Sequence, residues 1–454
     1  TPRAGWSEQD PEEWWRATQQ AIKQAMAESE CHATDILGIG LTGQMHGLVA
    51  LDREHRLIRP AILWNDGRSE AECQEIRSAL GLEGLVQHTG NDAYAGFTAP
   101  KLLWMRKHEP HHYDRIAHIL LPKDYIRLRL TGERATDRAG AGGTLLLDIE
   151  SRDWSPAVLE ALDISSEWLP PTHEGTDITG RISADAAQAT GLSEGIPVFA
   201  GAGDQAAQAI GVGATNTRTF ALTIGTSGVV FAPTASPVID PKGRIHAFPH
   251  ALPGLWHVMG VMLSAAGSLQ WYRDTFTPET PFEALMDEAS KAPPGADGVT
   301  FLPYLSGERT PHANPSARGA FTGLSLAHGR GHLTRAVLEG VAFGLKDNLR
   351  LLAEAGLPLP SELRASGGAM QSPLWRQVLA DTLEVPLVTT STTEGAAMGA
   401  AMLAGMGTGH WSDIAEASRA AVRTGPVIEP DPNRADAYDD SYQRFRALYP
   451  ALNG

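Results

Sequence analysis

Three apolar segments of this 454-residue chain share one pattern, in which a predicted strand runs directly into a glycine-rich turn. The strands are predicted at 196–200, 219–224 and 363–366, and the turns after them are Gly201-Ala202-Gly203-Asp204, Gly225-Thr226-Ser227-Gly228 and Gly367-Gly368-Ala369. Proteins of the α/β class bind ligands at the carboxyl ends of strands, where such turns expose backbone groups. The pattern therefore predicts an α/β, two-lobed nucleotide-binding enzyme.

The length of the chain supports more than one core. A chain of 454 residues exceeds one ordinary domain, so two lobes are expected, with a third conceivable. We place the first lobe at 1–215 and the second lobe, with a closing C-terminal helix, at 216–454. No apolar run reaches membrane-spanning length, and Cys31 and Cys73 are expected to be free thiols in a reducing cytoplasm.

The net charge limits the partners. A formal charge of -16 argues against a nucleic-acid or anionic membrane surface, since both need a basic face. It leaves room for a phosphate ligand, because a nest of backbone N–H groups binds phosphate inside an acidic protein. The expected partners are small molecules.

Several helices are signalled clearly. Asp10 before Pro11 predicts a helix that runs to about Glu30, and Ser372 before Pro373 predicts one over 373–383. The segment 332–352 carries one apolar stripe at helical spacing. Two glycines within that stripe indicate that another backbone or a ligand comes close.

Asp204 is the first candidate for chemistry. Taken alone, an aspartate between a strand and a helix is at least as well explained as a helix N-cap. The hairpin turn that begins 21 residues later, at Gly225, is suited to aim N–H and hydroxyl groups at phosphate oxygens. Phosphoryl transfer needs an acceptor oriented by a carboxylate and phosphates held by a neutralising site. The chain has no P-loop and no protein-kinase catalytic loop.

A second candidate is the loop around His46. A lone histidine is usually a satisfied, partly buried one, but Gln44 and the segment Trp64-Asn65-Asp66 add hydrogen-bonding and apolar groups. That mixture suits a polyol, whose hydroxyls need paired donors and acceptors. The dipeptides Lys123-Asp124 and Glu308-Arg309 are interpreted as structural or solvated ion pairs.

These residues resemble a known family over essentially the whole chain and in the right order. The segments that carry the resemblance are Trp6-Ser7-Glu8-Gln9-Asp10-Pro11, Gly43-Gln44-Met45-His46-Gly47, Trp64-Asn65-Asp66-Gly67-Arg68, Leu121-Pro122-Lys123-Asp124-Tyr125 and Tyr304-Leu305-Ser306-Gly307-Glu308-Arg309-Thr310-Pro311-His312. They are similar to those of the FGGY carbohydrate kinases, in their xylulokinase branch, within the hexokinase/actin-type superfamily. The resemblance implies two actin-like (ribonuclease H-like) lobes with the active site in the cleft between them.

The resemblance also implies an activity and a site. It implies ATP-dependent phosphorylation of D-xylulose in the cytoplasm, with Asp204 as general base toward the 5-hydroxyl and as a ligand of Mg²⁺ through water. The remaining implied site residues are Met45, His46 and Gln205 for the sugar, Gly225, Thr226 and Ser227 for the phosphates, and Gly368, Ala369, Ser372 and Trp271 for the adenosine. Homodimers are common among such relatives.

The sequence departs from the family at its beginning. Family members open with a strand hairpin that bears an Asp-x-Gly-Thr turn, and nothing of that kind precedes Trp6. We therefore expect that the first lobe as given lacks this hairpin because the natural chain begins earlier. Two alternatives stay open: an FGGY kinase for another ketose or polyol, and a catalytically inactive sugar- or nucleotide-binding fragment.

Overall fold

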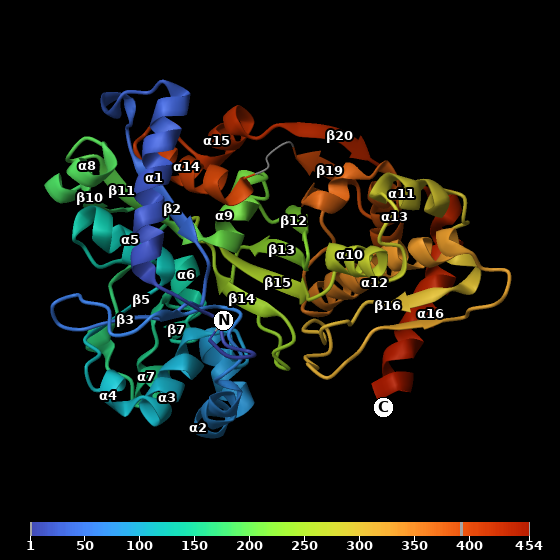
Figure 1. Cartoon of the computed structure of the whole chain (residues 1–454), viewed down its shortest axis with the longest axis horizontal. Coiled ribbons are helices and arrows are strands. Elements are labelled where there is room, and N and C mark those ends of the chain that lie inside the picture. Colours follow the sequence, from blue (N-terminus) through green and yellow to red (C-terminus); the bar gives the residue numbers. More distant parts are fainter. Residues whose placement is uncertain (1, 391–393, 454) are drawn as a thin grey trace.

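The computed structural model describes residues 2–390 and 394–453 and has two α/β lobes, each organised around its own sheet. Figure 1 shows the first lobe in blue to green and most of the second in yellow to red. The first sheet has the order β10 (Ile178–Arg181), β11 (Pro197–Gly203), β2 (Ile39–Gly43). The second has the order β14 (His246–Pro249), β15 (Trp256–Met262), β13 (Gly228–Thr234), β12 (Thr219–Ile224), β18 (Glu362–Ser366), β19 (Leu387–Thr390), β20 (Thr424–Ile428).

Helices and small strand pairs surround these sheets. The helices are α1 (Pro11–Ser29), α2 (Glu70–Thr89), α3 (Thr98–His108), α4 (Pro110–Tyr113), α5 (Pro122–Thr131), α6 (Arg138–Gly142), α7 (Pro156–Leu162), α8 (Ala184–Thr190), α9 (Asp204–Gly211), α10 (Ala266–Phe276), α11 (Phe282–Ser290), α12 (Arg330–Glu354), α13 (Pro373–Leu383), α14 (Gly395–Gly407), α15 (Ile414–Ala421) and α16 (Ala435–Asn453). The small pairs are β1 (Glu8–Gln9) with β4 (Ala61–Ile62), β3 (Val49–Leu51) with β5 (His118–Leu120), β6 (Thr136–Asp137) with β9 (Thr172–His173), β7 (Leu147–Asp148) with β8 (Asp153–Trp154), and β16 (Thr300–Leu302) with β17 (Ala320–Thr322). None of the helices in the described ranges is long and apolar enough to cross a membrane.

The predicted helix starts are confirmed. The Asp10 carboxylate accepts the Glu12 N–H at the start of α1, and the Ser372 hydroxyl accepts the Trp375 N–H at the start of α13. The glycine stripe on α12 marks a close approach of another chain segment, as expected. A Cβ at Gly340 would lie 2.3 Å from the Phe301 carbonyl oxygen of β16.

One strand is longer than predicted. The structure continues β11 through Gly201, which was predicted to begin a turn, up to Gly203. Gly201 has a φ of +68°, and the register with β2 shifts between Phe199 and Ala202. A Cβ at Gly201 would lie 1.8 Å from the Leu41 carbonyl oxygen, so only glycine lets the strand bend and stay paired there.

Two pairs of parallel strands decide where the loops meet. In the first lobe Gly203 of β11 lies opposite Gly43 of β2, so the loop after β2 and helix α9 leave the sheet side by side. In the second lobe Thr223 of β12 lies opposite Ser366 of β18. The turns after these strands therefore also lie together.

Helix α14 does not stay with the lobe that precedes it in the chain. It packs against α9 and against β2 and β11, and in Figure 1 its orange-red ribbon lies among the blue and green elements. The chain thus returns to the first lobe after β19. The predicted boundary at 215/216 falls in the connection between α9 and β12 and stays a prediction.

Candidate active site

A cavity of about 260 Å³ lies between the two lobes. It is lined from the first lobe by Gln44, Met45, His46, Trp64, Phe97, Asp204 and Gln205, and from the second by Ser227, Val229, His246, Phe248, Met259, Val261 and Arg309. The structure therefore brings the four predicted sugar-contacting residues together with one residue of the predicted phosphate turn.

Asp204 is the first residue of α9, and Gly203 occupies the N-cap position before it. Its carboxylate accepts the N–H of the adjacent Gln205, at 3.0 Å, and does not cap the helix. The alternative that Asp204 is an ordinary N-cap is therefore wrong for this structure. Burial raises the pKa of Asp204 above its usual range, and bonds from Gln205 partly oppose the shift. A desolvated carboxylate at a cavity wall is suited to accept a proton.

A buried ion cluster holds the strand end in front of Asp204. Lys123 binds Asp124 and lies 2.6 Å from a carboxylate oxygen of Asp137. Asp137 in turn accepts the N–H of Gly203 at 3.3 Å and that of Gly140 at 2.7 Å. The prediction of a structural ion pair at Lys123-Asp124 is confirmed.

His46 has a fixed orientation and a fixed tautomer. Its Nδ1 lies 2.7 Å from the Gly143 carbonyl oxygen, which only accepts, so Nδ1 carries the proton and Nε2 keeps a lone pair. Burial lowers the pKa of His46 to about 3, so the ring is neutral at pH 7. The backbone of His46 has a φ of +70°, an unusual conformation for a residue with a side chain. His46 therefore presents a hydrogen-bond acceptor to the cavity.

Lys101 holds the backbone of His46 in that conformation. Its fully buried ammonium donates to the carbonyl oxygens of His46, at 2.8 Å, and Gly96, at 2.6 Å. Thr98 donates to the same His46 oxygen at 3.0 Å. Nothing in the sequence pointed to this role of Lys101, because a lysine within a helix is normally solvated.

Replacing Lys101 with methionine is expected to change how stability depends on pH. Burial lowers the pKa of Lys101 to about 7 from an unfolded value near 10.5. Between these values the unfolded chain binds a proton that the folded chain does not, so this group makes stability rise with pH. The wild type should gain stability relative to Lys101→Met as the pH rises from 7 to 10, measured by urea unfolding. Parallel curves for the two proteins would contradict the assignment.

Trp64 lines the cavity, whereas Asp66 serves a different purpose from the one expected. The Asp66 carboxylate accepts two hydrogen bonds from the Arg68 guanidinium, at 2.8 and 2.7 Å, a third from the Arg68 backbone N–H at 3.0 Å, and a fourth from the backbone N–H of Ser7. Arg68 also bonds to Glu8. Of the segment predicted to contact the sugar, Trp64 therefore lines the cavity, while Asp66 holds the N-terminal segment against the first lobe.

Glu308 and Arg309 do not form the ion pair that was predicted. One Glu308 oxygen accepts the backbone N–H groups of Leu263, at 3.0 Å, and Arg309, at 2.7 Å. Burial raises the pKa of Glu308 to about 8, so it is mostly protonated at pH 7. The Arg309 side chain points elsewhere and lines the cavity. Adjacent positions in a loop need not face each other, which is why the sequence misled here.

The turn between β12 and β13 is open to a ligand. The carbonyls of Gly225 and Thr226 accept N–H groups from Ala266 and Ala265, so the turn is fastened to the start of α10. The backbone N–H groups of Thr226 and Ser227 donate to no acceptor in the part of the chain that the structure describes. Free, exposed N–H groups in a turn are a standard anion cradle.

A second pocket of about 490 Å³ lies beside this turn, between α10, α11 and α13. Gly368, Ala369 and Ser372 line it, together with apolar side chains that include Leu269, Phe282, Met286 and Trp375. Gly367, with a φ of +100°, touches the backbone at the end of β12, so this pocket adjoins the turn. Trp271 does not line it and instead stacks on Phe301 with 6.3 Å between ring centroids.

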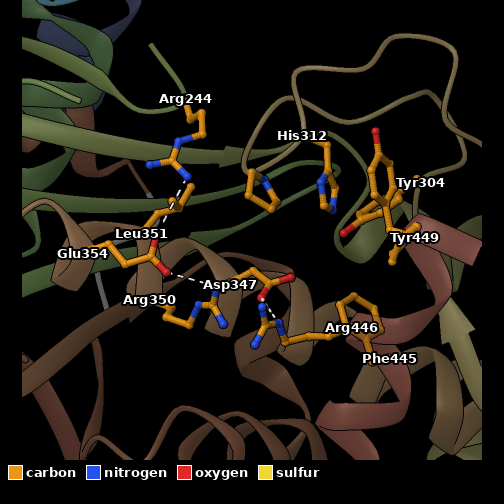
Figure 2. Close-up of a pocket in the computed structure, with 12 residues that line it drawn as sticks. Arg244, Tyr304, His312, Asp347, Arg350, Leu351, Glu354, Phe445, Arg446 and Tyr449 are labelled. Atoms are coloured by element: carbon orange, nitrogen blue, oxygen red, sulfur yellow. Dashed lines mark ion pairs between the residues drawn. The ribbon is translucent and has the colours of Figure 1, made fainter. Parts of the chain in front are cut away.

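A further hollow of about 340 Å³ lies where α16 meets α12 (Figure 2). Its cations are already paired. Arg350 lies 3.0 Å from Glu354, Arg446 lies 4.0 Å from Asp347, and Arg244 bonds to Asp240 at 2.9 Å. The hollow therefore has little unpaired charge for a ligand. The side chains around it hold α16 on the second lobe, and His312 stacks on Tyr449 with 3.4 Å between ring centroids.

The second lobe contributes residues to the cavity that were not predicted from the sequence, above all His246, Phe248 and Arg309. His246 and Phe248 alternate along β14, so both face the cavity. A period of two in a four-residue strand is too short to detect from sequence alone.

Together, the cleft places a desolvated carboxylate, a neutral imidazole acceptor and an N–H turn within one cavity, next to a largely apolar pocket. Comparisons with known proteins agree with this arrangement. Residues 1–211 match the model of the "FGGY family of carbohydrate kinases, N-terminal domain", and residues 220–408 match that of the C-terminal domain.

Individual relatives are similar over nearly the whole chain. A curated xylulose kinase of Escherichia coli is 43% identical and matches 99% of this chain and 92% of its own length. One of Bacillus subtilis is 38% identical and matches 98% and 89%. A solved structure of a xylulose kinase from Brucella ovis superposes with a TM-score of 0.92 at 41% identity, covering 100% of this chain and 92% of that one.

Proposed function

This chain belongs to the FGGY family of carbohydrate kinases, and on that premise we propose that it transfers the γ-phosphoryl group of ATP to the 5-hydroxyl of D-xylulose. The observation that carries the proposal is the shared cavity: the buried carboxylate of Asp204 and Ser227 of the open turn line the same space. A phosphoryl acceptor and a phosphate donor must meet in such a place.

The two lobes bind different parts of the substrates. Gly368, Ala369 and Ser372 hold the adenosine in the second pocket, and the N–H groups of Thr226 and Ser227 hold the phosphates. The sugar lies in the cleft against Met45, His46 and Gln205. Its 5-hydroxyl gives its proton to Asp204 as the new P–O bond forms and the bond to ADP breaks.

Mg²⁺ neutralises the phosphate charge when it is bound with ATP. In the described ranges no three His, Cys, Asp or Glu side chains form a group that could hold a metal ion. This fits a Mg²⁺ ion held mainly by phosphate oxygens and water, with Asp204 as the nearby carboxylate. We place the enzyme in the cytoplasm with ATP and the sugar as its partners, and a homodimer is the assembly to test.

A coupled ADP-release assay tests the proposal. We expect ADP release with D-xylulose at a kcat/KM at least about 100-fold above that with glycerol, because a pocket built to pair sugar hydroxyls leaves polar groups unpaired around a shorter polyol. Faster turnover of another pentulose or of a polyol would assign the chain to a different substrate within the family. Sugar binding by calorimetry without any ADP release would instead favour the inactive, ligand-binding alternative.

A further inference from the structure

One charged side chain of the second lobe faces the sugar cavity without a partner. Arg309 lies in the segment between β16 and β17 and lines the cavity. Its guanidinium lies over the Tyr94 ring, 5.2 Å from the centroid, and it makes no hydrogen bond or ion pair with any residue in 2–390 or 394–453. Burial of part of the side chain lowers its pKa. A half-buried arginine whose side-chain N–H groups have no acceptor in the protein keeps them available to a ligand in the cavity.

His246 is another polar residue that the second lobe contributes to the cavity. Asn91 uses its side-chain N–H₂ to donate to two carbonyl oxygens, those of Thr89 at 2.9 Å and Ala247 at 2.7 Å. Its amide oxygen therefore accepts from Nδ1 of His246, at 2.9 Å. Nε2 of His246 then keeps its lone pair, and it is buried without a partner among the described residues. Both histidines of the cavity, His46 and His246, thus offer acceptors.

Arg309 lies on the side of the cavity formed by Tyr94 and His246. Its guanidinium covers the Tyr94 ring, and Tyr94 packs edge-on against His246 with 5.2 Å between ring centroids. In the described ranges the side-chain carboxylate of Asp204 bonds only to Gln205. With the reacting hydroxyl at Asp204, Arg309 is therefore placed to meet another part of the sugar.

The structure of a 2-pentulose shows which hydrogen-bonding groups the sugar carries near C2. The furanose ring of a 2-pentulose closes through O5, which is the hydroxyl that must attack ATP. Only the open-chain form can react, and its C2 carbonyl accepts hydrogen bonds but donates none. We propose that Arg309 donates to this C2 carbonyl oxygen, while His46 and His246 accept from the hydroxyls beside it. The second lobe then selects a ketose over the corresponding pentitols, an inference that rests on the proposed function.

The test compares D-xylulose with the two pentitols obtained by reducing its C2 carbonyl. Arg309→Met should lower kcat/KM for D-xylulose about 30-fold or more, the usual worth of a buried hydrogen bond to a charged group. The same change should lower kcat/KM for the pentitols less than about threefold, because their reduced C2 is tetrahedral and its hydroxyl oxygen, although it can accept, leaves the plane of C1, C2 and C3 in which a carbonyl oxygen meets the guanidinium. Arg309→Lys, which keeps a cationic donor, should recover part of the preference for the ketose.

Arg318→Met is the matched control. Arg318 is an exposed arginine of the same segment, and among the described residues its side chain donates only to the carbonyls of Pro315 and Ala317. It should leave the ketose-to-pentitol ratio unchanged. Equal losses for ketose and pentitols in Arg309→Met, or no loss for either, would overturn the inference.

Calorimetry with D-xylulose and the pentitols in the absence of ATP separates this inference from the proposed function. If the wild type never releases ADP with D-xylulose, the proposed function fails, and the dissociation constants still test Arg309. Ketose binding that Arg309→Met does not weaken relative to pentitol binding would refute the role of Arg309 on its own.

Discussion

Replacing Asp204 with asparagine is expected to lower kcat for D-xylulose about 10²- to 10⁴-fold, the usual worth of a positioned general base. The KM for ATP should stay within about twofold, since the adenosine pocket and the Thr226–Ser227 turn lie on the other lobe. Single-turnover measurement of ADP formation at saturating sugar and ATP gives the comparison. Near-normal turnover in Asp204→Asn would refute the assignment of the base.

The same variant should not be less stable at pH 8. Because burial raises the pKa of Asp204, the folded chain holds a proton more tightly than the unfolded chain, and this group's effect on stability becomes more unfavourable as the pH rises through the raised pKa. Asparagine has nearly the same shape and no charge to desolvate. A thermal midpoint at pH 8 equal to or above that of the wild type separates lost chemistry from lost folding.

The pH profile gives an independent check of Asp204. The carboxylate acts as a base only when deprotonated, so kcat/KM of the wild type should fall as the pH drops through its raised pKa. That acid limb should be absent from the residual activity of Asp204→Asn. An acid limb that persists unchanged in the variant would assign the titration to another group.

Much of the fold could be predicted because local signals and tertiary packing agree. The Asp10 and Ser372 caps, the hairpin at Gly225 and the apolar stripe of α12 each express a local preference that the structure keeps. The pairing of parallel strands then brings Met45, His46 and Asp204 together, as the resemblance to the family implied.

The remainder depends on contacts between distant segments. Lys101 and Arg309 look like ordinary solvated cations in the sequence, and only the folded chain shows that one supports the His46 backbone and the other enters the cleft. The bend of β11 at Gly201 depends on the close backbone of β2. No local pattern carries such information.

The packing of α14 on the first lobe is also evident only in the folded chain. It holds α9, the helix that begins with Asp204. A Cβ at Gly399 of α14 would lie 1.9 Å from the Ala207 carbonyl oxygen of α9, and one at Gly211 would lie 1.9 Å from the Gly395 carbonyl oxygen. The two helices therefore touch backbone to backbone. Since α9 begins with Asp204, the position of the base depends on a helix almost 200 residues later in the chain.

Replacing Gly399 with alanine should therefore destabilise the protein by about 3 kcal/mol or more, at the upper end of the cost of overpacking, because both colliding groups belong to rigid backbones. The urea unfolding midpoint should fall clearly, and kcat for D-xylulose should fall at least about tenfold in the folded fraction, as α9 shifts and moves Asp204 out of line.

Gly84→Ala is the matched control, since a Cβ at Gly84 of α2 meets nothing within 4 Å. It should raise stability by about 0.5–1 kcal/mol through helix propensity alone and leave kcat unchanged. If Gly399→Ala yields no folded protein while Gly84→Ala gives a normal yield, the destabilisation is larger than predicted and has the expected direction. Equal midpoints and equal kcat in the two variants would show that α9 and α14 separate at little cost, and that Asp204 is held by the first lobe's own strands.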